Sequence, residues 1–213
     1  MWRRFKVELE FTTPFASGTP KNPKDIETML EVRMPTKAPP DATPIPELAE
    51  QVAEEVGVAE EGVERGHATF KRDEQGLYYE ARCVRAHIKD CANALQGFLQ
   101  IKALKAKVAQ RVYVEPEKLY LGKEEPDDYE IRIVHAFTPK GMRSSLKKID
   151  FVREARLTFY LKLLDDRVIG EDVLNAIFEY GGTHGMGQER SQDWGRYKVV
   201  VFEEVLPKGA LVK

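Results

Sequence analysis

The segment Arg4–Thr12 reads RFKVELEFT, and this short stretch decides the fold class. Its apolar residues Phe5, Val7, Leu9 and Phe11 alternate with charged residues. Alternation with a period of two is typical of a β-strand that buries one face and exposes the other. Antiparallel sheets commonly have one buried and one open face, so we expect this strand to belong to an antiparallel sheet.

Further strands and helices follow along the chain. The expected strands are Arg111–Glu115, Tyr129–Phe137, Arg156–Leu164 and Arg196–Glu204, and the expected helices are Val84–Leu95, Phe98–Ala109 and Gly170–Tyr180. Without insertions, the order is strand, helix, strand, strand, helix, strand, which is the split βαβ or ferredoxin-like pattern. We predict an α+β, RRM-like antiparallel sheet with two helices on one face. The other face would be open, as in many platforms for single-stranded nucleic acid.

Residues 14–80 are predicted to be a large insertion within a single domain that spans residues 1–213. Residues 14–46 hold eight of the twelve prolines and show no lasting period. An acidic helix is expected from Glu47 to Val56, ended by Gly57. Thr69–Ala81 is expected to form a β-hairpin. Residues 138–153 are basic and are expected to form a loop or a hairpin tip.

Charge is distributed in blocks, although the net charge is only −2. Residues 47–64 hold seven Glu and no Lys or Arg, whereas residues 82–111 hold seven Lys or Arg and one acid. Residues 138–156 hold six Lys or Arg and two acids. This separation predicts a polarised surface.

Several classes of protein are excluded or disfavoured. No apolar run approaches the ~18 residues of a membrane-spanning helix, and the charged N-terminus lacks a secretory signal, so we expect a cytoplasmic protein. Cys83 and Cys91 would be separated by ~12 Å of helical rise. A disulfide allows ~7 Å, so we expect reduced thiols. No His, Cys or Asp cluster has the spacing of metal ligands, and we expect no metal or cofactor.

The segment 181–195 holds five glycines and follows an expected helix. Glycine backbone amides exposed in such a loop can contact phosphate. Arg190 and Arg196 would add phosphate contacts, and Trp194 would stack a base. A Rossmann loop instead follows a strand and opens a helix, and the Gly-Lys-Ser/Thr of a P-loop is absent.

The loop resembles the C-terminal glycine-rich loop of the RAMP superfamily, whose pattern is Gly-x-Gly, five residues, then Gly-x-Gly followed by Arg or Lys. Gly185, Gly187 and Gly195 fit this pattern, whereas Asp193 stands where the family has glycine. Asp tolerates left-handed backbone geometry. The first strand and its polar loop at Leu9–Gly18 are also similar to this family. The resemblance implies a subunit of a CRISPR effector complex, which forms its backbone or processes its guide RNA, or a phage-encoded relative.

Three functional hypotheses follow. The first is binding of single-stranded nucleic acid, with RNA favoured over DNA, and its binding residues would be Arg82, Arg85, His87, Lys89, Arg143, Lys147, Lys148, Gly185, Gly187, Arg190, Trp194, Gly195 and Arg196. The distant basic blocks would converge near one end of the sheet. The second is a metal-independent endoribonuclease that uses His184 or His87. The third is a non-catalytic protein that self-assembles, as a homo-oligomer or within a multi-protein complex, through the insertion 14–80.

Overall fold

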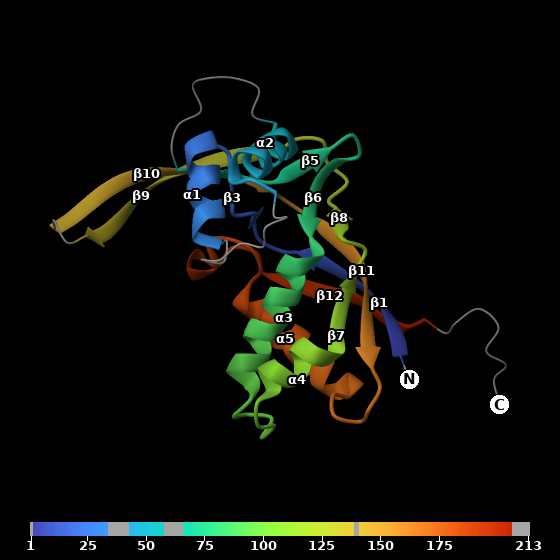
Figure 1. Cartoon of the computed structure of the whole chain (residues 1–213). Helices are drawn as coiled ribbons and strands as arrows, with labels where there is room; N and C mark the ends of the chain where they lie inside the picture. The colour runs from blue at the N-terminus through green and yellow to red at the C-terminus, as the bar shows by residue number, and fades with distance from the viewer. Residues whose placement is uncertain (1, 34–42, 58–65, 139–140, 206–213) are drawn as a thin grey trace. The chain divides into compact units, whose positions relative to one another are not determined.

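The computed structural model describes residues 2–33, 43–57, 66–138 and 141–205, with the backbone alone at 136–138 and 143. The chain divides into two compact units (Figure 1). Unit 1 consists of Met1–Phe15, Tyr79–Gly122 and Arg153–Lys213, and unit 2 of Ala16–Tyr78 and Lys123–Val152. The structure therefore groups most of the predicted insertion with a second segment, residues 123–152.

Unit 1 contains a four-stranded sheet and three helices. Its elements are β1 (Trp2–Phe11), α3 (Ala81–Leu95), α4 (Leu104–Arg111), β7 (Val112–Glu115), β8 (Lys118–Tyr120), β11 (Arg156–Leu164), α5 (Glu171–His184), the 3-10 turn η1 (Arg190–Gln192) and β12 (Tyr197–Glu204). The strand order in the sheet is β12-β1-β11-β7, and each neighbouring pair is antiparallel. The α+β class and the antiparallel sheet are thereby confirmed.

The core of unit 1 explains the alternation in β1. Phe5, Val7 and Leu9 are fully buried, and Val7 lies opposite Phe159 on β11. The ring of Phe178 on α5 packs 6.3 Å from that of Phe159, which fixes the helix on this face of the sheet. Each fully buried large apolar side chain stabilises the fold by roughly 1.5–3 kcal/mol.

In its described residues, unit 2 contains two helices and several strands. Its elements are β3 (Thr19–Pro20), α1 (Pro23–Arg33), α2 (Ile45–Val56), β4 (His67–Thr69), β5 (Lys71–Asp73), β9 (Asp128–Thr138) and β10 (Gly141–Val152), while β2 (Phe15–Ala16) and β6 (Gly76–Glu80) cross the unit boundaries. Helices α1 and α2 bury Ile26, Ala49 and Val56 between them. Gly57 ends α2 with a φ of 66°, as the sequence predicted. The predicted hairpin is also confirmed by the pairing of β5 with β6. Residues 58–64 of the acidic block lie outside the described residues.

One expectation was wrong. Residues 138–153, predicted as a loop or hairpin tip, mostly form the twelve-residue strand β10, which pairs with β9. The opposed residues Ile133 and Leu146 are 65% and 60% exposed. As far as its side chains are described, the outer part of β10, up to Leu146, has no buried face, so nothing selects alternating polarity there.

Two helix boundaries also differ from the prediction. Helix α4 begins at Leu104 rather than Phe98, and α5 continues four residues beyond Tyr180 to His184. Gly181 therefore lies within the helix. Glycine is needed there because a Cβ would lie 2.3 Å from the hydroxyl oxygen of Tyr197. The glycine permits close helix packing at this position instead of marking a loop. Within the described residues, no helix combines the length and apolar character needed to cross a membrane.

Candidate functional site

The glycine-rich loop of unit 1 begins after α5 and is tightly folded. Gly185, Gly187 and Gly195 have φ angles of 81°, 86° and 73°. The backbone N–H of Met186 donates to the carbonyl of Gly195 at 2.9 Å, and the N–H of Gly195 donates to the carbonyl of Pro14 at 2.7 Å. A Cβ on Gly195 would lie 1.8 Å from the Met186 carbonyl oxygen. The loop therefore requires glycine at this position.

Asp193 adopts a left-handed backbone conformation, with a φ of 63°. Its carboxylate accepts a hydrogen bond from Arg196 at 2.5 Å. Trp194 differs from its prediction, because its side chain is only 7% exposed. The ring is therefore buried and is not open to a base.

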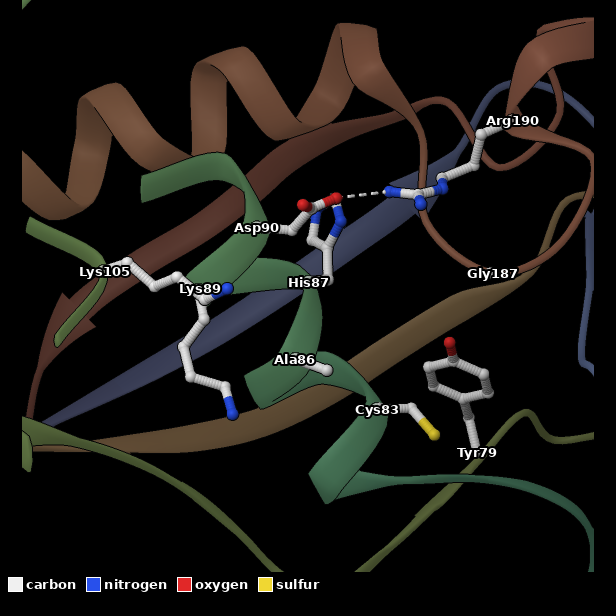
Figure 2. A pocket seen from close by; sticks show the side chains of 9 residues that line it. All are labelled: Tyr79, Cys83, Ala86, His87, Lys89, Asp90, Lys105, Gly187 and Arg190. Carbon is white, nitrogen blue, oxygen red and sulfur yellow. Dashed lines mark hydrogen bonds and ion pairs between the residues drawn. The ribbon is translucent and has the colours of Figure 1, made fainter. Parts of the chain in front are cut away.

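An open cavity of about 480 Å³ lies between α3, α4 and this loop, all in unit 1. Figure 2 shows Arg190 reaching from the loop toward Asp90 on α3. The lining residues are Tyr79, Cys83, Ala86, His87, Lys89, Asp90, Lys105, Gly187 and Arg190. The cavity thus brings four predicted residues, His87, Lys89, Gly187 and Arg190, together from two separate segments.

Two of the lining cations are not neutralised. Lys89 and Lys105 make no ion pair or hydrogen bond with any other described residue. An ammonium group without a carboxylate partner attracts anions, and positive-φ glycine backbone lets a phosphate approach closely. The cavity is therefore suited to an anionic ligand.

The third cation, Arg190, is held in a polar network. Its Nη1 donates to Oδ2 of Asp90 at 2.8 Å and to Nε2 of His184 at 2.8 Å. The hydrogen bond from Arg190 holds the pKa of Asp90 below its usual value. Because a guanidinium can only donate, Nε2 of His184 accepts, which places the imidazole proton on Nδ1.

His87 is buried beneath the cavity. Its Nε2 lies 3.0 Å from the hydroxyl of Tyr197 and 3.6 Å from Sγ of Cys91. Burial lowers the pKa of His87 to about 3, and the positive charge of Arg190 acts in the same direction. The imidazole is therefore neutral near pH 7 and cannot donate a proton to a leaving group, which argues against His87 as a nuclease residue.

Tyr79 contributes a protonated hydroxyl to the cavity lining. Burial raises the pKa of its phenol well above the usual value. The group can therefore donate a hydrogen bond at any physiological pH.

Other predicted binding residues have structural partners. Arg82 forms an ion pair with Glu80 at 2.5 Å. Arg85 donates to the carbonyl of Ala109 and lies 4.3 Å from the ring centroid of Tyr113. The two contacts of Arg85 join α3 to α4 and β7. This side chain therefore supports the fold rather than facing the cavity.

The basic residues of β10 belong to unit 2. Lys148 lies 4.0 Å from the ring centroid of Tyr129, and Lys147 is on the same strand. The side chain of Arg143 lies outside the described residues. The predicted convergence of this block with α3 stays a prediction.

The open face of the sheet in unit 1 is engaged by its own side chains. Arg4 lies 3.9 Å from the ring centroid of Tyr160, and Lys162 lies 5.3 Å from that of Trp2. Glu115 approaches both Arg4 and Lys162, at 3.8 and 3.9 Å. Arg4 and Lys162 thus already lie over these rings, and Glu115 lies beside both cations. This face is therefore a weaker candidate than the cavity.

Sequence reasoning missed Lys105, Asp90 and Tyr79 as parts of the site. Lys105 belongs to the basic block 82–111, so its charge was visible, but only the packing of α4 against α3 brings it to Lys89. Among the described residues, no three His, Cys, Asp or Glu side chains could together hold a metal ion.

Comparisons with known proteins give little. No protein-family model and no curated protein matches the sequence. One solved structure with some likeness is the cryo-EM structure of the Type III-B Cmr-beta bound to cognate target RNA, with a TM-score of 0.46 and 10% identity. The match covers 96% of this chain and 61% of that chain. A likeness of this size carries no argument about function.

Proposed function

We propose that this protein binds single-stranded nucleic acid through its phosphates, with RNA favoured over DNA. The observation that carries the proposal is the cavity that Lys89, Lys105 and Arg190 line together with Gly187. Single strands are commonly bound by positively charged grooves that follow the sugar–phosphate chain. The preference for RNA rests on the resemblance of Gly185, Gly187 and Gly195 to the RAMP loop.

We also propose that unit 1 is a ferredoxin-like, RAMP-like domain into which unit 2 is inserted. Its strand order β12-β1-β11-β7 supports this, as does the course of the chain through α3 from β1 to β7 and through α5 from β11 to β12. Each helix then connects two strands that are separated by one other strand, as in a split βαβ unit.

The direct test is a titration of fluorescently labelled 15-nucleotide RNA and DNA, read by fluorescence polarisation. The double variant Lys89→Glu/Lys105→Glu should bind at least tenfold more weakly than the wild type. Lys198→Glu is the matched control, because this lysine is exposed on β12 and lies outside the cavity lining. Binding to neither strand at low salt, or equal losses in both variants, would refute the proposal.

Salt dependence gives a second readout. Removal of two phosphate-contacting charges, as in Lys89→Ala/Lys105→Ala, should reduce the slope of log affinity against log salt by about 1.4, at ~0.7 per phosphate contact for single strands. An unchanged slope would show that these ammonium groups do not contact phosphate.

A second function, self-assembly, is favoured by the exposed apolar residues of β9 and β10 in unit 2. Ile131, Ile133, Met142 and Leu146 are each more than half exposed. Exposed apolar patches of this kind mark interaction sites. Light scattering should show a mass above that of one chain, which falls in Leu146→Lys. A monomer at all concentrations would exclude this function.

The endoribonuclease alternative now rests on His184 alone. RNA incubated with the protein in EDTA should stay intact, because Nε2 of His184 is held by Arg190 and is not directed at a substrate. Cleavage that disappears in His184→Ala would instead establish the enzyme.

A further inference from the structure

A second cavity lies beside His184 in unit 1, and nothing above uses it. Its volume is about 570 Å³, and its lining is Leu95, Phe98, Ala176, Glu179, Tyr180, Thr183 and His184. Phe98 is 82% exposed, which is unusual for a large aromatic residue. The cavity therefore combines apolar walls with a few polar groups.

Two stacked aromatic rings line this cavity. Tyr180 and His184 are four residues apart on α5, and their rings lie 5.4 Å apart with an angle of 20° between their planes. The ring of His184 also stacks with that of His87, at 6.4 Å and 17°, so the partly exposed ring of Tyr180 is the π surface on which a base of a single strand would stack.

The two cavities are joined through His184. This side chain lines the second cavity, and its Nε2 lies 2.8 Å from Nη1 of Arg190, which lines the first. Because the two cavities are neighbours, the second is within reach of the base of a nucleotide whose phosphate contacts Arg190. Carboxylate and hydroxyl groups of Glu179 and Thr183 are available there for the polar edge of a base.

We infer that the cavity lined by Phe98, Tyr180 and His184 is a nucleobase subsite of the bound strand. The inference rests on the proposed function, since the phosphate contacts at Arg190 position the nucleotide. A purely apolar occupant, such as a side chain of a protein partner, fits less well because the guanidinium of Arg190 lies beside His184.

The test compares an RNA oligonucleotide with an abasic strand of the same length, which keeps the phosphates and lacks the bases. Phe98→Ala should weaken binding of the RNA by about fivefold or more, as expected for one lost stacking contact. Binding of the abasic strand should not change. Phe98→Tyr, which keeps the ring, should restore RNA affinity. The variants should fold normally because the side chain is exposed.

The outcomes separate this inference from the proposed function. Lys89→Glu/Lys105→Glu should weaken both strands, because it acts on phosphate. If that double variant has its effect while Phe98→Ala weakens neither strand, or both equally, the subsite is refuted and the phosphate site stands. If the wild type binds neither strand, both proposals fall. Photocrosslinking of 5-iodouridine RNA should label Tyr180, His184 or Phe98, and labelling confined to other residues would also refute the subsite.

Discussion

Arg190 and Asp90 are 100 residues apart in the sequence, and Nη1 of the arginine donates to Oδ2 of the aspartate at 2.8 Å. The two side chains are 38% and 52% exposed. Ion pairs as exposed as this one contribute little to stability. A phosphate can therefore replace the carboxylate of Asp90 as the partner of Arg190 at small cost.

Asp90→Asn should tighten RNA binding by about threefold to tenfold, because it removes a negative charge from the cavity and releases Arg190. Fluorescence polarisation at fixed salt measures the change. Asp172→Asn, at an exposed position of α5, makes the same charge change away from the cavity and should have a smaller effect. Weaker binding by Asp90→Asn would show that the ion pair organises the site instead of competing with the ligand.

The two cysteines report on occupancy of the cavity. Cys83 is half-buried and lines the cavity, whereas Cys91 is fully buried and burial raises the pKa of its thiol to about 12. One thiol per folded chain should react with DTNB, and two after unfolding. Saturating RNA should slow the reaction of Cys83 several-fold in the wild type but not in Lys89→Glu/Lys105→Glu. A rate that RNA does not affect would place the strand elsewhere.

Gly195→Ala should destabilise the protein by about 1–3 kcal/mol or more, since the residue has a φ of 73° and its Cβ would meet the Met186 carbonyl. Gly97→Ala is the matched control, because a Cβ there meets nothing within 4 Å. Its effect should stay within about 0.5 kcal/mol. Urea unfolding measures both free energies, and equal values would mean that the loop relaxes freely.

Stability should depend on pH through His87. The pKa of this imidazole is about 3 in the folded protein and about 6.5 when unfolded. The unfolded chain therefore binds the proton first, and the free energy of unfolding falls as the pH drops from about 6.5 toward about 3. The slope from this group is at most about 1.4 kcal/mol per pH unit.

Urea unfolding at several pH values between 4 and 7 tests this linkage. His87→Gln should show a flatter dependence than the wild type, and His135→Gln, at an exposed position of β9, should not differ from it. If His87→Gln kept the wild-type slope, the imidazole would not be the buried titrating group.

Most strands that the sequence predicted have one buried face, and β9 is the exception, since its Ile131 and Ile133 are exposed. The alternation in Arg4–Thr12 arises because Phe5, Val7 and Leu9 must be buried while their neighbours are not. The strand β10 gave no such signal, since both faces of its outer part are exposed. The extension of α5 was hidden because Gly181 reads as a loop residue, although it is selected by the approach of Tyr197.

The candidate site was predicted only in part, for a physical reason. The charge of Lys89 and Arg190 and the glycines of the loop are properties of single residues. Whether an arginine such as Arg85 faces a ligand or caps the carbonyl of Ala109 depends on how α3 and α4 pack. The pairing of Arg190 with Asp90 likewise exists only after distant segments have folded together.

The position of β1 in its sheet has a consequence for synthesis of the protein. This strand is synthesised well before its two hydrogen-bonding neighbours, β11 and β12, which begin at Arg156 and Tyr197. Pairings between residues so distant in sequence form slowly. The pairing edges of β1 thus stay unfilled until β11 and β12 have been made, and a nascent chain halted before residue 197 would leave one edge of that strand open to other polypeptides.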